Sequence, residues 1–425
     1  MAAAAPAQPI SVVMATFNGA RFVGELLDSL AAQTQLPAEL VVGDDGSVDE
    51  TIEIIERFAE RAPFEIRVFR NPQRLGATEN FLTTCMRARG PLIALTDWDD
   101  VWQRTKLERV APWFGDPAVG LVIHRADVVD EALRPLGRRF PDIRRTRVLS
   151  ARRLDPWFSG SGLVVFRRRL LDVVAPYATD RPREANGHPM DHDDWLYLLS
   201  SSLATTVLLA EDLVLYRQHG GSYMGAPTGS QREQVDRALV LDAASFRRQA
   251  AMFRSRRELW RAVAGAAAVD ASERREAGLS AAWNDRLASL SDARAGVRDD
   301  TIGRLLRIAR LGRLAVTGGY RPRTMTGLGL RALAADAISL LRPGRAAPAD
   351  TAFDELARRV AADRAAGRTP EAVMTALNAE GVPPLYGRRW TTQMIRDLVF
   401  HARRLNEAEA IRAATSTEAG PKPTS

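Results

Sequence analysis

The sequence predicts an α/β fold, with a mostly parallel sheet flanked by helices and a helical C-terminal region. Two observations predict it. In the first hundred residues, strand-like apolar runs alternate with segments of helical spacing, and polar residues follow the strands where they end. A repeated strand-helix-strand order makes successive strands parallel and places helices on both faces of the sheet.

The expected elements follow one another without long connections. In chain order they are strand 10–16, helix 20–33, strand 39–45, helix 47–61, strand 65–70, helix 77–89 and strand 91–97. The helical segments carry apolar residues on one face. Ser47, with Glu50 three residues later, forms a capping-box pattern that predicts the start of the second helix.

Beyond residue 100 the pattern changes to strands with longer connections and then to helices. We expect strands at 120–130 and 160–168, a helix at 191–202 and two short strands within 205–219. The predicted parts of the chain are an α/β domain at 9–230, a helical arginine-rich extension at 231–343, a small helical module at 352–404 and a disordered tail at 405–425.

Composition narrows the class of protein. The chain has 425 residues, is 46% hydrophobic and contains one cysteine, Cys85, which excludes an internal disulfide framework. No apolar stretch reaches the length of a membrane-spanning helix, and the N-terminal ten residues lack the pattern of a signal peptide. We therefore expect a cytoplasmic protein.

Positive charge is concentrated in residues 302–345, which carry nine arginines and one acid, Asp336. Their net charge of 9 − 1 = +8 compares with +7 for the whole chain. One interpretation is a basic amphipathic helix that contacts the inner face of the cell membrane. The expected apolar face is Leu305, Ala309, Gly312 and Val316, with Arg304, Arg307 and Arg310 beside it. A solvated helix face and a nucleic-acid contact are the alternatives.

Three carboxylates, Asp97, Asp99 and Asp100, follow the buried run that ends at residue 97. Like charges this close raise one another's pKa, so a fold that keeps them must offset the repulsion. A divalent cation does so most simply, and hard oxygen ligands suit Mg²⁺ or Mn²⁺. Because ligands bind at the carboxyl ends of strands in such sheets, we favour a metal site. The alternative is a solvated acidic turn.

A second acidic pair, Asp193 and Asp194, opens the expected helix at 191–202. One of the two carboxylates can serve as a general base toward an acceptor hydroxyl. Both can also be simple capping acids, which the helix dipole favours. His219 ends the last expected strand, where it is either a further metal ligand or an ordinary polar residue.

These motifs, in this order, resemble family 2 glycosyltransferases of the GT-A fold. The resemblance covers roughly residues 9–225 and rests on six segments: "SVVMATFNGARFVGELLDSLAAQTQLPAELVVGDDGSVDET", "NPQRLGATENF", "ARGPLIALTDWDDVWQRTKLERV", "FSGSGLVVFRRRLL", "DHDDW" and "LVLYRQHGGS". The rhamnosyltransferase-like subgroup is the most similar. That subgroup usually carries D-Q-D-D-x-W, and Trp98 stands at the position of its Gln.

The resemblance implies roles for individual residues. Donor contacts would be Thr16, Phe17, Asn18, Asp45, Arg74, Gly76 and Asp97. The ligands of Mg²⁺ or Mn²⁺ would be Asp97, Asp99, Asp100 and His219. The acceptor would meet Gly160, Ser161, Gly162 and Trp195. Asp193 occupies the position of the catalytic base, with Asp194 a close competitor.

The function implied is a metal-dependent inverting glycosyltransferase. It would move a sugar from a nucleoside-diphosphate sugar, with dTDP-rhamnose as one candidate, to a glycan or lipid-linked hydroxyl. Two other hypotheses remain open. One is a nucleic-acid-binding regulator with a nucleotide-sugar-sensing domain, and the other is an enzyme-derived scaffold without turnover.

Residues 352–404 resemble the small helical recombinase domain of large serine recombinases, through "AVMTALNAEGVPPLYGRRWTTQMIRDLVFHAR". Thr369 and Pro370 predict the start of one helix, Gly381 its end, and Thr391 the cap of the next. The domain that carries the recombinase nucleophile has no counterpart in this sequence. The module is therefore expected to contact a partner or, as the alternative, DNA.

Overall fold

The computed structural model describes residues 8–152, 160–177, 181–182, 189–219, 241–320, 329–341, 350–385 and 390–418. The chain divides into two compact units. The described residues of the first unit lie within 8–219 and 255–283, and those of the second lie within 241–254 and 284–418. Two long helices, α8 (Ala243–Gly265) and α9 (Ala271–Arg298), contribute to both units.

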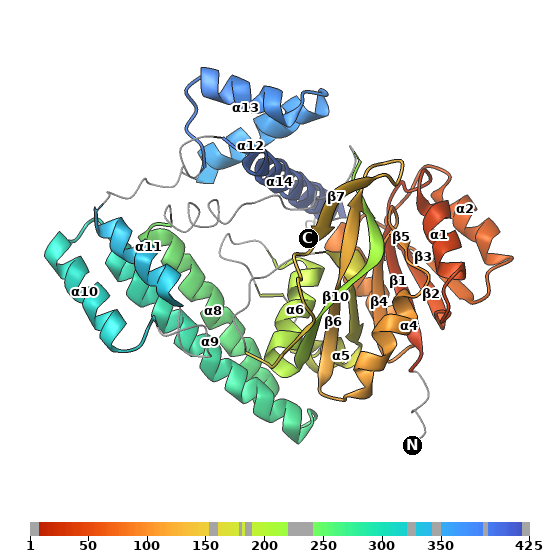
Figure 1. Ribbon diagram of the computed structural model, residues 1–425, viewed down its shortest axis with the longest axis horizontal. Coiled ribbons are helices and arrows are strands. Elements are labelled where there is room, and N and C mark those ends of the chain that lie inside the picture. The colour runs from red at the N-terminus through yellow and green to blue at the C-terminus, as the bar shows by residue number, and fades with distance from the viewer. Residues whose placement is uncertain are drawn as a thin grey trace, which may run out of the picture. The chain divides into compact units, whose positions relative to one another are not determined.

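A ten-stranded mixed sheet forms the centre of the first unit (Figure 1). Its strands are β1 (Ile10–Thr16), β2 (Glu39–Asp44), β3 (Glu65–Arg70), β4 (Leu92–Asp97), β5 (Val101–Trp102), β6 (Val119–Val129), β7 (Pro135–Phe140), β8 (Arg147–Leu149), β9 (Val164–Arg167) and β10 (Thr205–Arg217). The spatial order is β3-β2-β1-β4-β9-β6-β10-β5, with β7 on β6 and β8 on β10.

Strand direction divides this sheet into two kinds of pairing. β1 pairs in parallel with β2 and β4, β2 with β3, and β6 with β10. β9 lies antiparallel between β4 and β6, and β5 is antiparallel to β10. The predicted α/β class, with a mostly parallel sheet in the first hundred residues, is confirmed. The C-terminal helical region is also present.

Short helices connect the strands of the first unit. They are α1 (Val23–Ala31), α2 (Thr51–Ala59), α3 (Ala77–Arg87), α4 (Lys106–Val110), α5 (Arg169–Val174) and α6 (His192–Leu203), with 3-10 turns at Ala111–Gly115 and Ser161–Leu163. Two sequence expectations were wrong here. Ser47 does not cap α2, because α2 begins at Thr51 with Glu50 at its N-cap, and the Ser47 hydroxyl oxygen accepts from Asn18 N. Residues 205–217 form one strand with register shifts against β6, rather than two short strands.

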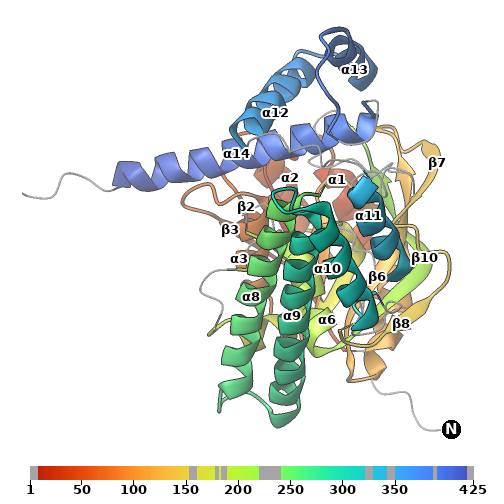
Figure 2. The ribbon, with the colours of Figure 1, turned by 90° about the vertical axis from the view of Figure 1, so that its left-hand side faces the viewer.

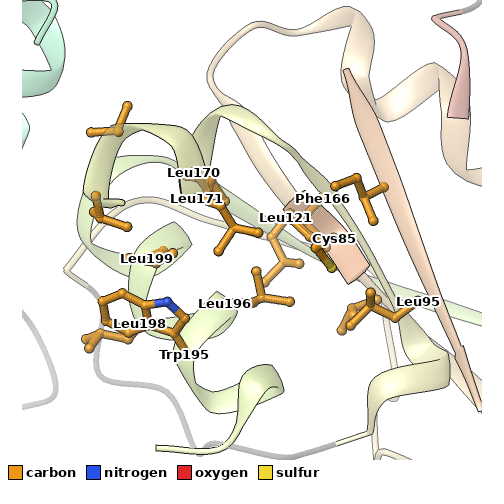
Figure 3. Close-up of a cluster of buried hydrophobic side chains, with 14 of the residues drawn as sticks. Cys85, Leu95, Leu121, Phe166, Leu170, Leu171, Trp195, Leu196, Leu198 and Leu199 are labelled. Carbon is orange, nitrogen blue, oxygen red and sulfur yellow. The ribbon is translucent and has the colours of Figure 1, made fainter. Parts of the chain in front are cut away.

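The core of the first unit lies between the sheet and helices α3, α5 and α6 (Figure 3). Its buried side chains include Leu95 and Phe166 from the sheet and Leu196 and Leu199 from α6. Burying a side chain of this size contributes about 1.5–3 kcal/mol. This packing fixes the end of β4 relative to the start of α6, and both of these ends carry candidate site residues.

The second unit is helical in its described part. Besides segments of α8 and α9 it contains α10 (Arg304–Val316), α11 (Gly329–Leu341), α12 (Asp350–Ala365), α13 (Pro370–Ala379) and α14 (Thr392–Glu418). Asp336 of α11 is 0% exposed and accepts hydrogen bonds from Arg294 and Arg298 of α9, which lies beside α11 (Figure 2). Tyr320 Oη donates to the same carboxylate at 2.6 Å.

Helices α12, α13 and α14 share a small core of their own, centred on Val360, Leu377 and Leu398. Thr369 caps α13 through a 3.2 Å hydrogen bond from Ala372 N, as its sequence predicted. α14 continues to Glu418, so helical structure extends past residue 405, where the sequence predicted a disordered tail. None of the described helices combines the length and apolarity that crossing a bilayer requires.

Candidate active site

The acidic rim, which we define as Asp97, Asp99 and Asp100, sits where β4 ends and turns into β5. Asp97 and Asp99 are half-buried, whereas Asp100 is 1% exposed. Asp97 Oδ2 accepts a hydrogen bond from Gly162 N at 3.2 Å. Asp99 Oδ2 lies 2.8 Å from His219 Nε2. The predicted metal ligands therefore lie at one end of the sheet, but Asp97 and Asp99 face different partners.

Arg217, at the end of β10, holds the turn that bears the rim. Its side chain is 1% exposed, its Nε donates to Asp99 O at 2.7 Å, and its backbone N–H donates to Asp100 Oδ1 at 3.2 Å. The guanidinium also pairs with Glu25 and lies 4.4 Å from the centre of the Phe22 ring. An arginine stays charged even when buried, so it provides a fixed positive charge behind the carboxylates.

Lys106 supplies a second buried cationic group. It is 0% exposed, its Nζ donates to Gly162 O at 2.8 Å, and it lies 3.4 Å from the centre of the Trp102 ring. Burial lowers the pKa of Lys106, and the nearby carboxylates of Asp100 and Asp97 oppose that shift. Lys106 thereby ties the Gly162 backbone to the interior beneath the rim.

Protonation offers a further way to reduce the repulsion. Burial, and then the charges of Asp99 and Asp97, hold the pKa of the Asp100 carboxyl well above its usual range. The sequence interpretation relied on a metal ion alone to offset the three carboxylates. In the structure, Lys106 and the raised pKa of Asp100 already do part of this.

The rim suits a metal ion whose remaining ligands come from the substrate. Within the described ranges, no three His, Cys, Asp or Glu side chains are arranged to hold one ion. Carboxylates are nevertheless the donors that Mg²⁺ and Mn²⁺ prefer, and Mg²⁺ is commonly held by one or two carboxylates plus substrate phosphates. Asp97 and Asp99 fit that requirement. Asp100, predicted as a third ligand, is instead directed into the interior, and its Oδ2 has no hydrogen-bond partner among the described residues.

Gly162 is packed tightly against the acidic rim. A Cβ at this position would lie 2.5 Å from Asp100 Oδ2 and 3.5 Å from Asp97 Oδ2. Such an approach has no room for any larger residue. Glycine is therefore required at 162 by the close contact with the two carboxylates.

The loop after β1 carries Thr16, Phe17 and Asn18, three of the predicted donor contacts. Asn18 has a positive φ of 51°, and its Oδ1 accepts from Val48 N at 2.9 Å while its own N–H donates to Ser47 Oγ at 2.9 Å. Thr16 Oγ1 is buried and has no hydrogen-bond partner among the described residues. The loop after β1 is thus fixed to the loop after β2.

Asp45 organises the next loop. Its carboxylate accepts from the backbone N–H groups of Leu75 at 2.7 Å and Gly76 at 2.8 Å, and from Asn71 Nδ2 at 3.2 Å. Arg74, 60% exposed, places its guanidinium 4.0 Å from the centre of the Phe17 ring. Phe17, Asp45, Arg74 and Gly76 therefore lie in one group.

An aromatic cluster that the sequence did not indicate lies beside the rim. Trp98 stacks on Phe22 with a centroid distance of 6.2 Å, and the ring of His219 lies 4.9 Å from that of Phe22. A Cβ at Gly19 would lie 2.9 Å from the Trp98 ring. The Trp98 indole therefore packs on the loop after β1.

The 160–162 segment connects the rim to the second acidic pair. Asp193 Oδ2 accepts from Gly160 N at 2.8 Å, two residues from the Gly162 N–H that Asp97 accepts. Asp193 is half-buried, whereas Asp194 is 6% exposed. This exposure favours Asp193 as the carboxylate that can reach a bound hydroxyl. Ser161 lies in the same segment, within the 3-10 turn at Ser161–Leu163.

Trp195, predicted to contact the acceptor, lies in the core of the first unit. Its side chain is 3% exposed and packs in the core with Leu198 and Leu199 (Figure 3). The predicted acceptor contact at Trp195 is therefore replaced by a packing role. His192, beside it, is buried against Phe81, and burial lowers the pKa of His192 to about 4.

Comparison with known proteins finds a family that part of this chain resembles. The profile described as "Glycosyl transferase family 2" matches residues 11–174, which span β1 to α5 and include the acidic rim and the 160–162 segment. Residues 11–174 are thus similar to family 2 glycosyl transferases. The chain is accordingly a glycosyltransferase.

Relatives of the glycosyl transferase domain come from several bacteria. An uncharacterised glycosyltransferase of Nostoc sp. is 28% identical over 234 residues, which cover 53% of this chain and 70% of the relative. The glycosyltransferase GlyG of Streptococcus pneumoniae is 24% identical, over 51% of this chain and 72% of the relative. An uncharacterised protein of Mycobacterium tuberculosis is 30% identical, over 49% of this chain and 59% of the relative.

Among solved structures, Staphylococcus aureus TarS 1–349 aligns with a TM-score of 0.43 and 18% identity, covering 78% of this chain and 90% of that one. The mannosyltransferase PcManGT of Pyrobaculum calidifontis, in complex with GDP-Man and Mn²⁺, aligns with a TM-score of 0.36 and 19% identity. It covers 80% of this chain and 88% of that one.

Lys106 and Arg217 are the site residues that the sequence analysis missed. Both are charged side chains, which are almost never fully buried unless paired. One signal was available: Lys106 is one of two lysines in a chain that otherwise uses arginine. Arg217 gave no comparable signal, because its 117-residue separation from Asp100 hides the contact.

Proposed function

We propose that this chain is a metal-dependent inverting glycosyltransferase that transfers a sugar from a nucleoside-diphosphate sugar to an acceptor hydroxyl. The observation that carries the proposal is the 160–162 segment. Its backbone N–H groups bind Asp193 at one end and Asp97 at the other, so a base candidate and a metal-ligand candidate share one short support.

Donor binding follows from the chemistry of the strand ends. Asp97 and Asp99 would hold Mg²⁺ or Mn²⁺ together with the diphosphate, and His219 orients Asp99 through their 2.8 Å contact. The bound ion would neutralise charge that develops on the leaving diphosphate. Phe17, Arg74 and the Asp45-supported loop lie where the nucleoside would be recognised.

The transfer step requires a base opposite the leaving group. Asp193 would take the proton of the acceptor hydroxyl as that oxygen attacks the anomeric carbon. The bond between the anomeric carbon and the diphosphate oxygen breaks, and the configuration inverts because attack comes from the opposite face. We propose dTDP-rhamnose as the first donor to test, and a glycan or lipid-linked acceptor. Because the single cysteine is a buried free thiol, we also propose a cytoplasmic location.

Calorimetry with a panel of nucleoside diphosphates tests the donor site. We expect binding in Mn²⁺ or Mg²⁺ that is lost with EDTA and weakened at least ten-fold by Asp99→Asn. Asp142→Asn, at an exposed carboxylate with 75% side-chain accessibility, serves as the matched control. Equal affinity with and without EDTA would remove the metal from the proposal. Thermal shift with intact nucleotide sugars would then identify the donor.

A further inference from the structure

Helix α10 in the second unit presents apolar side chains to solvent. Leu305 is 84% exposed, Val316 88%, Leu306 50% and Ile308 45%. At 100° per residue, Leu305, Ile308 and Val316 share one face with Ala309 and Gly312, both of which are also exposed. Leu305 and Val316 are eleven residues apart, about 16 Å along the helix axis.

The opposite face of α10 is already used for packing. Leu314 is 5% exposed and joins Leu290 and Tyr320 in a small core. Arg307 is 8% exposed, and its guanidinium donates to Val297 O at 2.7 Å and pairs with Asp300. Arg307 was predicted to border the exposed apolar face, so the structure corrects that assignment. The apolar stripe therefore stays exposed although the opposite face of α10 is packed.

Arginines border this stripe on both sides. Arg304 and Arg313 are exposed, and neither forms an ion pair with an acidic residue in the described part of the chain. Arg310, further round the helix, is exposed and donates to Gly296 O at 3.2 Å. Helix α10 itself contains no acidic residue. The stripe is thus apolar at its centre and positive at its edges.

We propose that α10 lies on an anionic lipid surface, with the face of Leu305, Ile308 and Val316 in the interfacial region and Arg304 and Arg313 at the phosphates. This combination of a solvent-facing apolar stripe and flanking cations matches an interfacial helix. Charge complementarity selects this occupant, because an uncharged apolar partner would gain nothing from the arginine edges. The inference concerns a surface of the second unit and does not depend on the proposed function.

Vesicle co-sedimentation of the full chain tests the inference, with phosphatidylglycerol/phosphatidylcholine vesicles compared with pure phosphatidylcholine. We expect binding to the anionic vesicles only, and weaker binding at 1 M salt, where the Debye length falls to about 3 Å. Arg304→Gln with Arg313→Gln should weaken binding about 30-fold, since each arginine near such a surface contributes about five-fold. Leu305→Gln with Val316→Gln should weaken it at least ten-fold.

Matched controls change an exposed apolar side chain and an exposed arginine outside α10. Val148, 56% exposed on β8, is changed to Gln, and Arg144, with 83% side-chain accessibility, is changed to Gln. Neither control should alter vesicle binding. All of these positions are exposed, so circular dichroism and donor-site calorimetry should match those of the wild type.

Four outcomes would overturn the proposal. Binding to neither vesicle would do so, as would binding that the control changes weaken equally. A shift of duplex DNA that requires Arg304 and Arg313, without vesicle binding, would assign the surface to nucleic acid. A concentration-dependent dimer in sedimentation velocity that Leu305→Gln with Val316→Gln dissociates, without vesicle binding, would assign it to a second copy of the chain.

Discussion

Asp100 of the acidic rim and Asp336 of α11 are both buried carboxylates, yet their surroundings differ. Asp336 accepts from Arg294 at 2.7 and 2.9 Å, from Arg298 at 3.0 Å and from Tyr320 at 2.6 Å. Asp100 has one hydrogen-bonded oxygen and one that is unpartnered among the described residues, and two more carboxylates stand beside it.

The difference separates two uses of buried charge. A fully hydrogen-bonded carboxylate such as Asp336 holds helices together and has no remaining capacity to bind a ligand. The rim combines neighbouring like charges with one Asp100 oxygen that no described residue satisfies, a state typical of sites where a ligand completes the interactions. The comparison predicts that changes at Asp336 affect stability, whereas changes around the rim affect binding and turnover.

The largest effect should come from Asp336→Ala. Removing this carboxylate leaves Arg294 and Arg298 buried without a counter-charge, so we expect a loss of about 3–5 kcal/mol in the free energy of unfolding. Urea denaturation would measure it. The control is Asp292→Ala, whose carboxylate pairs with Arg254 at an exposed position and should change stability by about 1 kcal/mol or less. Similar shifts for both variants would contradict the structural role of Asp336.

Asp193→Asn should lower kcat by about 100-fold, the size of a lost general base. The Asn amide oxygen still accepts the hydrogen bond from the Gly160 N–H. Affinity for the nucleotide-sugar donor should therefore stay within about two-fold of the wild type. Steady-state transfer to an acceptor would show the change in kcat. If Asp194→Asn is the more damaging substitution, the base lies one position further along α6.

His192 should make stability depend on pH. Burial depresses the pKa of His192 to about 4. Between pH ~6.5 and 4, His192 is therefore protonated in the unfolded chain but neutral in the folded chain. Stability is therefore full above pH ~6.5 and is lost as pH falls toward 4, by about 2 kcal/mol at pH 5. His192→Gln should remove this part of the pH dependence. A Tm difference from the wild type that stays constant between pH 7.5 and 5 would count against it.

The smallest effect should come from Lys106→Met. The variant removes the donor to Gly162 O and the cation nearest Asp100, so the Gly162 N–H that positions Asp97 is less firmly held. We expect nucleoside-diphosphate affinity in Mn²⁺ to fall about ten-fold, similar to the loss of one hydrogen bond to a charged group. Arg109→Met, which removes an exposed pair with Glu211, should leave affinity unchanged.

Much of the first unit could be predicted from sequence because its pattern is local. The four strands up to residue 97 and the helices between them follow from apolar runs and spacing alone, and so does the position of the acidic rim at a strand end. The two ends of α13 were also readable, since the Thr369 hydroxyl caps its start and Gly381, with a φ of 70°, follows its end.

The remaining features depend on contacts distant in sequence. Trp195 was misassigned because a tryptophan beside two acids has the same local pattern whether it faces a ligand or the core. Ser47 was misassigned as a cap because its hydroxyl oxygen accepts from Asn18 N, a residue 29 positions earlier, and α2 begins only at Thr51. Which face of α10 is buried was equally unreadable, since Arg307 is buried only through its contacts with Val297, Ser339 and Asp300.

The partnership of Asp100 with Arg217 has a consequence for synthesis on the ribosome. Asp100 emerges 117 residues before Arg217, whose backbone N–H donates to its carboxylate. At ~5–20 residues per second, the nascent chain carries the acidic rim without this partner for about 6–23 s. Strands β1 to β4 can form early, but the end of the sheet that bears the rim can close only when β10 arrives. A chain interrupted before Arg217 should therefore remain open at the future active site.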